Sequence, residues 1–214
     1  FAHQITDELL AHDPKALVVA CNTAAAVALD ELRDRLDIPV FGVIEPGVRA
    51  LVQATRSGHV GVIGTVGTIN SGAYQRAVRD AAPDLQLTAL ACPGLVEFVE
   101  RGETDSEQVH VLAERLLAPA VDAEVDALLL GCTHYPYLAR MLGVVMGREV
   151  VLVSSADETA FEVRRALEAA GLAAAGAERP LPTFLTTGDV GWFTDLGSRL
   201  LGPELAGAKQ VTWD

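Results

Sequence analysis

The sequence predicts an α/β protein with mostly parallel sheets. Half of its 214 residues are hydrophobic but only 5% are aromatic, as in buried parallel strands packed under helices. Short runs rich in β-formers alternate with helical patterns, and this alternation is typical of βαβ units. A chain of this length can bury a substantial core, as one domain or as two small lobes around a cleft.

Six apolar runs are predicted as strands, and a seventh near the end. They are 16–20, 40–44, 60–63, 85–91, 127–130, 150–153 and 183–186. The segments with apolar residues at three- and four-residue spacing are predicted as helices. They are 24–36, 47–56, 71–82, 106–118 and 156–170, after a helix-like start that runs to about Ala11.

Two places along the chain suit a crossing between lobes. In DIPVFGVIEPG, Glu45, Pro46 and Gly47 are predicted to end a strand, and the second crossing falls near Ser154 and Ser155. Residues 1–44 and 155–214 would then form the first α/β lobe, incomplete at its N-terminus, and residues 45–154 the second. Residues 171–182 are predicted to form a surface turn.

The charge of the chain argues against several classes of partner. A formal net charge of −13 opposes binding to nucleic acid or to an anionic membrane, because a phosphate-binding surface needs clustered Lys and Arg. No apolar run approaches the roughly 20 residues that span a bilayer, and the start lacks a basic stretch followed by an apolar one. We therefore expect a cytoplasmic protein without nucleic-acid or membrane partners.

A repeated local pattern marks two of the three cysteines. In ALVVACNTA (16–24) and ALLLGCTHYP (127–136) an apolar strand is followed by a small residue, Cys21 or Cys132, and two polar residues. In parallel sheets, ligands bind beyond the carboxyl ends of the strands. Free cysteine often serves only as a small buried hydrophobe, but the matching contexts favour one shared functional site.

The polar neighbours of these cysteines suit a small carboxylated ligand. Asn22, Thr23 and Thr133 can donate side-chain hydrogen bonds, and nearby backbone amides can hold an anion. His134 titrates in a range that lets it exchange a proton with a thiol or orient one. We predict Cys92, which lacks polar followers, to be structural.

Weaker signals lie elsewhere in the sequence. GVIGT (61–65) predicts the hydroxyl of Thr65 at a strand end. For Glu100, the sequence favours a functional role no more than a solvated position on a helix. Neither GxGxxG nor a P-loop occurs, so nucleotide binding is not indicated. Cys21, Cys132 and His134 are also suitable zinc ligands, although they lack the paired short spacings of structural zinc sites.

Five segments together resemble glutamate racemase, in order and at similar spacing along nearly the whole chain. They are VACNTA, GVIGTVGTI, ACPGLVEFVERG, LLLGCTHYPYL and VSSADETA. GCTH resembles the glutamate enzymes, whereas the related aspartate racemases typically carry Glu at the position of His134. The resemblance implies two pseudo-symmetric α/β lobes enclosing glutamate, with no pyridoxal phosphate and no metal.

The resemblance also implies roles for individual residues. Cys21 would take the α-proton from D-glutamate and Cys132 from L-glutamate, with His134 assisting Cys132 and Glu100 supporting that side. The expected substrate-binding residues are Asn22, Thr23, Thr65, Thr133 and His134. The product would be D-glutamate for bacterial peptidoglycan, and family members are often homodimers.

One departure from the family concerns the segment before Cys21. The family begins with a strand ending in Phe-Asp-Ser-Gly and continues to a Tyr-Gly substrate loop, and neither occurs here. We therefore expect the sequence to be a fragment of a longer protein. An aspartate or hydantoin racemase, and an inactive glutamate-binding or regulatory protein, remain as alternatives.

Overall fold

The computed structural model describes residues 1–174, 176, 181–205 and 207–213. These residues form two compact units, Phe1–Ala173 and Ala174–Asp214, and each unit is described by itself. The larger unit carries every residue that the sequence predicts for the functional site.

A two-stranded parallel sheet lies near the start of the larger unit. Its strands β1 (Leu17–Val19) and β2 (Val40–Gly42) are joined by helix α2 (Asn22–Arg35), and α1 (Ala2–Leu10) precedes them. Leu29 and Leu32 of α2 pack against Leu17 and Val40 of the strands. This βαβ unit holds the amino end of α2 directly beyond the carboxyl end of β1.

The second sheet of this unit has four parallel strands in the order β4-β3-β5-β6. Their bounds are β3 (His59–Gly64), β4 (Gln86–Ala91), β5 (Ala127–Gly131) and β6 (Val151–Val153). All residues of β5, and all of β3 after His59, are buried. Central parallel strands covered on both faces account for these continuous apolar runs.

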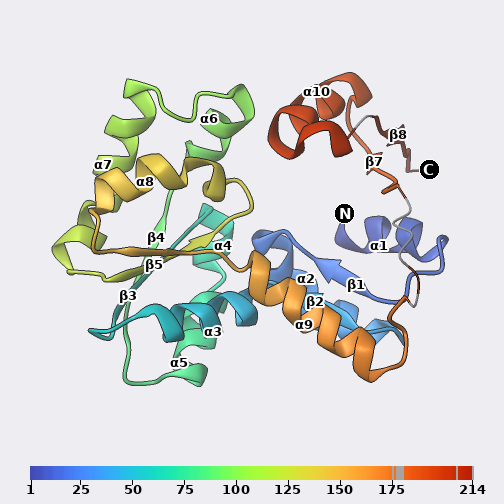
Figure 1. The fold of residues 1–214 in the computed structure, drawn as a ribbon, viewed down its shortest axis with the longest axis horizontal. Helices are drawn as coiled ribbons and strands as arrows, with labels where there is room; N and C mark the ends of the chain where they lie inside the picture. Colours follow the sequence, from blue (N-terminus) through green and yellow to red (C-terminus); the bar gives the residue numbers. More distant parts are fainter. Residues whose placement is uncertain (175, 177–180, 206, 214) are drawn as a thin grey trace. The chain divides into compact units, whose positions relative to one another are not determined.

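Helices cover both faces of the four-stranded sheet, as Figure 1 shows. Helices α3 (Ile44–Ala54) and α5 (Ala73–Ala81) lie on one face, and α6 (Leu95–Arg101), α7 (Glu107–Asp122) and α8 (Ala139–Met146) lie on the other. The short α4 (Val66–Asn70) follows β3, and a 3₁₀ helix, Tyr135–Leu138, follows β5. Helix α9 (Ala156–Ala169) packs on α3 and β2.

The smaller unit pairs two short parallel strands, β7 (Leu185–Thr186) and β8 (Lys209–Gln210). Between them run α10 (Val190–Leu201) and a 3₁₀ helix, Gly202–Glu204. The Asp189 side chain caps α10 by accepting from the Trp192 backbone N–H.

The predicted α/β class and each of the seven predicted strands are confirmed, with shifts at their ends. One boundary was wrong: Ile44 begins α3 instead of ending a strand, and Glu45, Pro46 and Gly47 lie within the helix. Proline is tolerated in a first helical turn because the backbone N–H it lacks would have no partner within the helix there. The two-lobe boundaries stay a prediction.

The helix predicted at 71–82 is confirmed as α5, with its ends shifted by one or two residues. The structure has α4 ending at Asn70 and α5 beginning at Ala73. Gly72 separates them with a φ of 71°, in the left-handed region that glycine adopts most readily. Of the turn predicted at 171–182, residues 175 and 177–180 lie outside the described residues.

No helix within the described ranges is long and apolar enough to cross a membrane.

Candidate active site

The predicted site residues follow the carboxyl ends of several parallel strands. Gly64, the last residue of β3, pairs with Ala91 of β4 and with Gly131 of β5. Thr65 and Cys132 therefore lie at the same edge of the four-stranded sheet. Cys21 follows β1, and hydrogen bonds from its neighbours connect it to this edge.

Cys21 is the N-cap residue of α2 and is exposed. Its backbone is extended (φ −74°, ψ 119°), and its carbonyl accepts the first bond of the helix from the Ala25 N–H. A helix N-terminus carries a partial positive charge from its free N–H groups, which favours a thiolate. Cys21 thus lies exposed at the amino end of α2, beyond the carboxyl end of β1.

Three threonine hydroxyls join α2 to the loop after β3. The Oγ1 atoms of Thr23, Thr65 and Thr68 lie 2.9 Å from one another, pair by pair. Thr65 is also the N-cap of α4, where its Oγ1 accepts from the Thr68 backbone N–H. The cluster fixes Thr23, two residues after Cys21, beside the end of β3.

Cys132 lies in a more enclosed setting, only 7% exposed. Its Sγ is 3.9 Å from Nδ1 of His134, and Nε2 of His134 is 3.4 Å from Oε1 of Glu100. The Thr133 hydroxyl is 3.3 Å from the same Nδ1. With Glu100 accepting from the Nε2 side, Nδ1 of a neutral His134 faces the thiol as an acceptor.

Burial raises the pKa of the Cys132 thiol above its ordinary value. Backbone N–H groups of His134 and Tyr135 and the Thr133 hydroxyl oppose this rise, since they donate to the thiolate, whereas negative charge on Cys21 adds to it. Cys21 thus lies close enough for a negative charge on it to raise the pKa of Cys132.

Cys92 is 1% exposed, with its Sγ 3.8 Å from the Leu90 carbonyl oxygen. Burial raises its pKa to about 12, so it stays a neutral thiol. Its backbone carbonyl accepts from the Tyr135 hydroxyl at 3.0 Å. This geometry agrees with the structural role predicted for Cys92.

Sequence reasoning missed two residues that the structure brings to the site. Thr68 could have been found from the GTVGT repeat, which sets a second threonine three residues after Thr65 at an N-cap. Tyr74 had no local signal: its hydroxyl receives a hydrogen bond from Asn22, 52 positions earlier.

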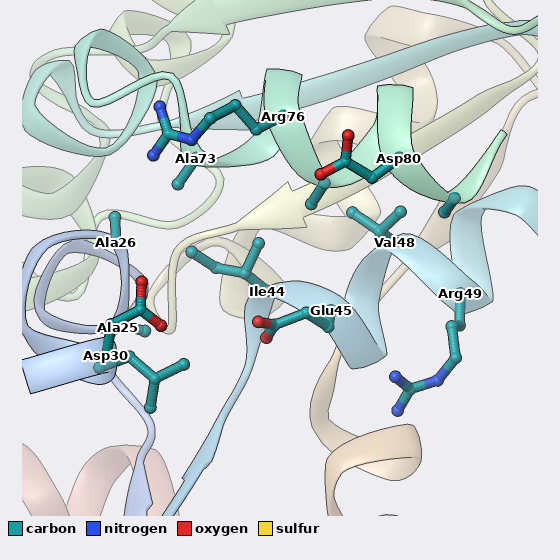
Figure 2. Close-up of a pocket in the computed structure, with 13 residues that line it drawn as sticks. Ala25, Ala26, Asp30, Ile44, Glu45, Val48, Arg49, Ala73, Arg76 and Asp80 are labelled. Carbon is teal, nitrogen blue, oxygen red and sulfur yellow. The ribbon is translucent and has the colours of Figure 1, made fainter. Parts of the chain in front are cut away.

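A separate hollow lies between α2, α3 and α5 (Figure 2). It has a volume of about 430 Å³, and charged side chains of both signs line it, among them Glu45, Arg76 and Asp80. None of the predicted site residues lines this hollow in the described part of the chain.

The zinc alternative finds no support in the geometry. Among the residues that the structure describes, no group of three or more His, Cys, Asp and Glu side chains is arranged to hold a metal ion. Cys21, Cys132 and His134 therefore do not form such a group.

Comparison with known proteins agrees with this arrangement. The family model for Asp/Glu/Hydantoin racemase matches residues 2–174 of the chain. The chain belongs to this family. Within it, the glutamate racemase of Acidothermus cellulolyticus is 50% identical over 202 residues, which are 94% of this chain and 76% of the relative.

Solved racemases of the family share the fold. The crystal structure of a Bacillus anthracis glutamate racemase matches with a TM-score of 0.92 and 40% identity, over all of this chain and 79% of that one. The Francisella tularensis glutamate racemase, solved in complex with D-glutamate, matches with a TM-score of 0.91 and 30% identity, over 99% of this chain and 79% of that one. The predicted family, enzyme class and α/β racemase fold are thereby confirmed.

Proposed function

We propose that this member of the racemase family interconverts L- and D-glutamate with Cys21 and Cys132 as two bases and without a cofactor. The observation that carries the proposal is the pair of thiols beyond β1 and β5, with Cys21 at the N-terminus of α2 and the Cys132 sulfur beside His134. The relatives named as glutamate racemases support the choice of substrate.

The proposed reaction needs two bases because inversion delivers a proton to the face opposite the one that lost it. The Cys132 thiolate takes the α-proton of L-glutamate, and the C–H electron pair remains on the α-carbon, delocalised into the carboxylate. The Cys21 thiol then protonates the opposite face, which leaves Cys21 as thiolate and Cys132 as thiol. D-glutamate reacts from that state in the reverse direction.

The surrounding groups have separate roles in this proposal. His134, held by Glu100, accepts the proton of Cys132 and returns it. The hydroxyls of Thr23, Thr65 and Thr133 and the amide of Asn22 bind the amino acid. Preorganised donors stabilise the negative charge that develops on its carboxylate during proton removal.

The cellular setting follows from the product. D-glutamate serves the synthesis of bacterial peptidoglycan, so we place the enzyme in the cytoplasm. We propose a homodimer as its assembly, with glutamate as its small-molecule substrate and no nucleic-acid or membrane partner.

The test is racemisation of L- and D-glutamate in deuterated water by the full-length protein and its Cys21→Ser and Cys132→Ser variants. We expect solvent deuterium at the α-carbon of the product and a loss of about 100-fold or more in each variant, as for a removed general acid or base. Cys92→Ala is the matched control and keeps the rate. Wild-type rates in both serine variants would refute the mechanism.

The same assay, run with further substrates, distinguishes the alternative functions. Faster turnover of aspartate or a hydantoin than of glutamate would reassign the substrate. Glutamate binding without deuterium at its α-carbon would point to a binding or regulatory protein.

A further inference from the structure

Tyr74, near the start of α5, contacts both halves of the site. Its side chain is fully buried, and its hydroxyl oxygen accepts a hydrogen bond from the Asn22 side-chain amide at 2.6 Å. Asn22 directly follows Cys21 and is itself only 3% exposed. The bond therefore ties the first residue of α2 to a helix that packs on the four-stranded sheet.

The ring of Tyr74 lies against the end of β5. A methyl group added at Gly131 would lie 2.9 Å from Cε2 and 3.3 Å from Cζ of this ring, and 2.7 Å from the Ile63 carbonyl oxygen. Only a residue without a side chain permits such a close approach. Gly131 directly precedes Cys132, so one side chain touches the neighbours of both cysteines, Asn22 with its hydroxyl and Gly131 with its ring.

We propose that Tyr74 is a positioning residue that sets the Cys21 side of the site through Asn22 and supports the Cys132 side through Gly131. The inference rests on the proposed two-cysteine function and adds a residue to it. The hydroxyl serves the Cys21 side and the ring serves the Cys132 side, so a substitution that removes only the hydroxyl separates the two effects.

The phenol acts by position and not by proton transfer. Burial raises the pKa of Tyr74 well above its ordinary value, and negative charge on Cys132 and Glu45 adds to the rise, although the Asn22 bond opposes it. Tyr74 therefore stays neutral wherever the enzyme works. Its oxygen holds one amide hydrogen of Asn22 and so directs the side-chain oxygen of Asn22, which suits a ligand ammonium group.

Loss of this oxygen leaves a buried amide hydrogen of Asn22 without its acceptor, a condition that folded proteins avoid. The Asn22 side chain then turns to find another partner and no longer orients the ligand against Cys21. The expected result of Tyr74→Phe in the full-length protein is a fall in kcat/KM of about tenfold, the usual scale for one lost buried hydrogen bond.

Substrate deuterium isotope effects show which half of the site has changed. The equilibrium constant between the two enantiomers is one, so the kcat/KM values for L- and D-glutamate must stay equal in every variant. A fall in kcat/KM therefore cannot show which cysteine is affected. Removal of the α-deuteron from D-glutamate reports the Cys21 step, and removal from L-glutamate reports the Cys132 step. Tyr74→Phe should raise the isotope effect with D-glutamate and lower it with L-glutamate, whereas a merely structural loss moves neither.

A double-mutant cycle with Asn22→Ala tests whether Tyr74 acts through Asn22. If it does, Tyr74→Phe has little further effect on kcat/KM in the Asn22→Ala background, because coupled residues are not additive. A full tenfold loss in that background would overturn the proposal, and so would unchanged isotope effects in the single variant.

Tyr135→Phe is the matched control for stability, since it also removes a buried tyrosine hydroxyl with one hydrogen bond, to the Cys92 carbonyl. Thermal unfolding of both variants shows whether each is folded at the assay temperature. The isotope effect is a ratio of two rates of the same preparation, so an unfolded fraction does not change it. Wild-type rates in both cysteine-to-serine variants would refute the proposed function itself. If both cysteines are essential but Tyr74→Phe has wild-type kinetics, only the inference about Tyr74 is refuted.

Discussion

The two thiols of the candidate site differ in their surroundings. Cys21 is exposed at the N-terminus of α2, whereas Cys132 is buried and relies on His134 and three donors to its thiolate. Burial disfavours the charged form, so the thiolate of Cys132 needs those donors more than that of Cys21 does. The two proposed bases would therefore perform the same proton transfer in different environments, one exposed and one buried.

Alkylation with iodoacetamide should distinguish the three cysteines, because the thiolate is the reacting form. We expect Cys21 to react about tenfold faster than Cys132 at pH 8, because burial raises the pKa of the Cys132 thiol and limits access of the reagent to it. The Cys132 rate should keep rising with pH beyond the point where an ordinary thiol levels off. Peptide mass spectrometry measures each site.

Cys92 provides the internal standard for this measurement. Its pKa of about 12 and its burial predict the slowest reaction of the three. Faster labelling of Cys132 than of Cys21 at pH 8 would contradict the described environments.

The sequence allowed some of these residues to be predicted and not others. Cys21, Cys132 and His134 carry a local signal, a polar motif directly after an apolar strand, and Glu100 came only from the family resemblance. Thr68 carries a local signal in the GTVGT repeat, but Tyr74 could not be chosen in the same way, because its partner Asn22 lies 52 positions away. The roles of all these residues stay a proposal.

At the scale of elements, the sheet edge opposite the cysteines is held by one carboxylate. Asp126, just before β5, accepts from the Thr55 hydroxyl at 2.6 Å and from the backbone N–H groups of Arg56 and Ser57 at 2.8 and 2.7 Å. These residues lead into β3, which pairs with β5. Asp126 thereby fixes the start of the two central strands.

Asp126→Asn should lower the free energy of unfolding at neutral pH by about 2 kcal/mol, the scale of hydrogen bonds to a charged group. Burial of Asp126 opposes its ionisation, but the bonds from Thr55, Arg56 and Ser57 outweigh burial and lower its pKa from 3.8 to about 2. Because the folded pKa is depressed, the stabilisation is present above pH 3.8 and is lost as the pH falls towards 2. Urea unfolding across this range measures it.

The matched control is Asp84→Asn, which removes the same charge from an exposed position. It should leave stability nearly unchanged. The stability gap between wild type and Asp126→Asn should narrow below pH 3.8, and a gap that widens there would contradict the assignment. Since Asp126 lies at the far edge of the sheet, kcat/KM of the folded variant should equal that of wild type.

The strands were predictable as elements because burial on both faces gives β3 and β5 continuous apolar runs. The start of α3 could not be predicted in this way, because Pro46 and Gly47 are typical of turns. They are compatible with a helix here only because they lie near its start. Local residue preference favours the wrong structure at such positions.

At the scale of the molecule, polar groups at the candidate site help to join the two sheets of the larger unit, beside the apolar packing between them. Thr23 on α2 bonds Thr65 and Thr68 beyond β3, and Asn22 bonds Tyr74 on α5. An amino acid bound among these groups would add bonds on both sides. Substrate binding and cohesion between the sheets are therefore linked in the proposed function.

Hydrogen exchange of the full-length protein with and without D-glutamate tests this linkage. At about 100 times its dissociation constant, a ligand that binds only the folded state stabilises it by roughly 2.7 kcal/mol, and this stabilisation should slow exchange throughout the unit. The largest local slowing should appear at 22–25, at 65–68 and at 132–135, since the ligand would bridge the three strand ends. Aspartate is one methylene shorter and should protect these segments less. Thr65→Val should weaken the effect of glutamate at 22–25 as well as at 65–68, because Thr65 bonds Thr23. Slowing confined to one segment would mean that the ligand contacts only one strand end, and the strand ends would then not share a single site.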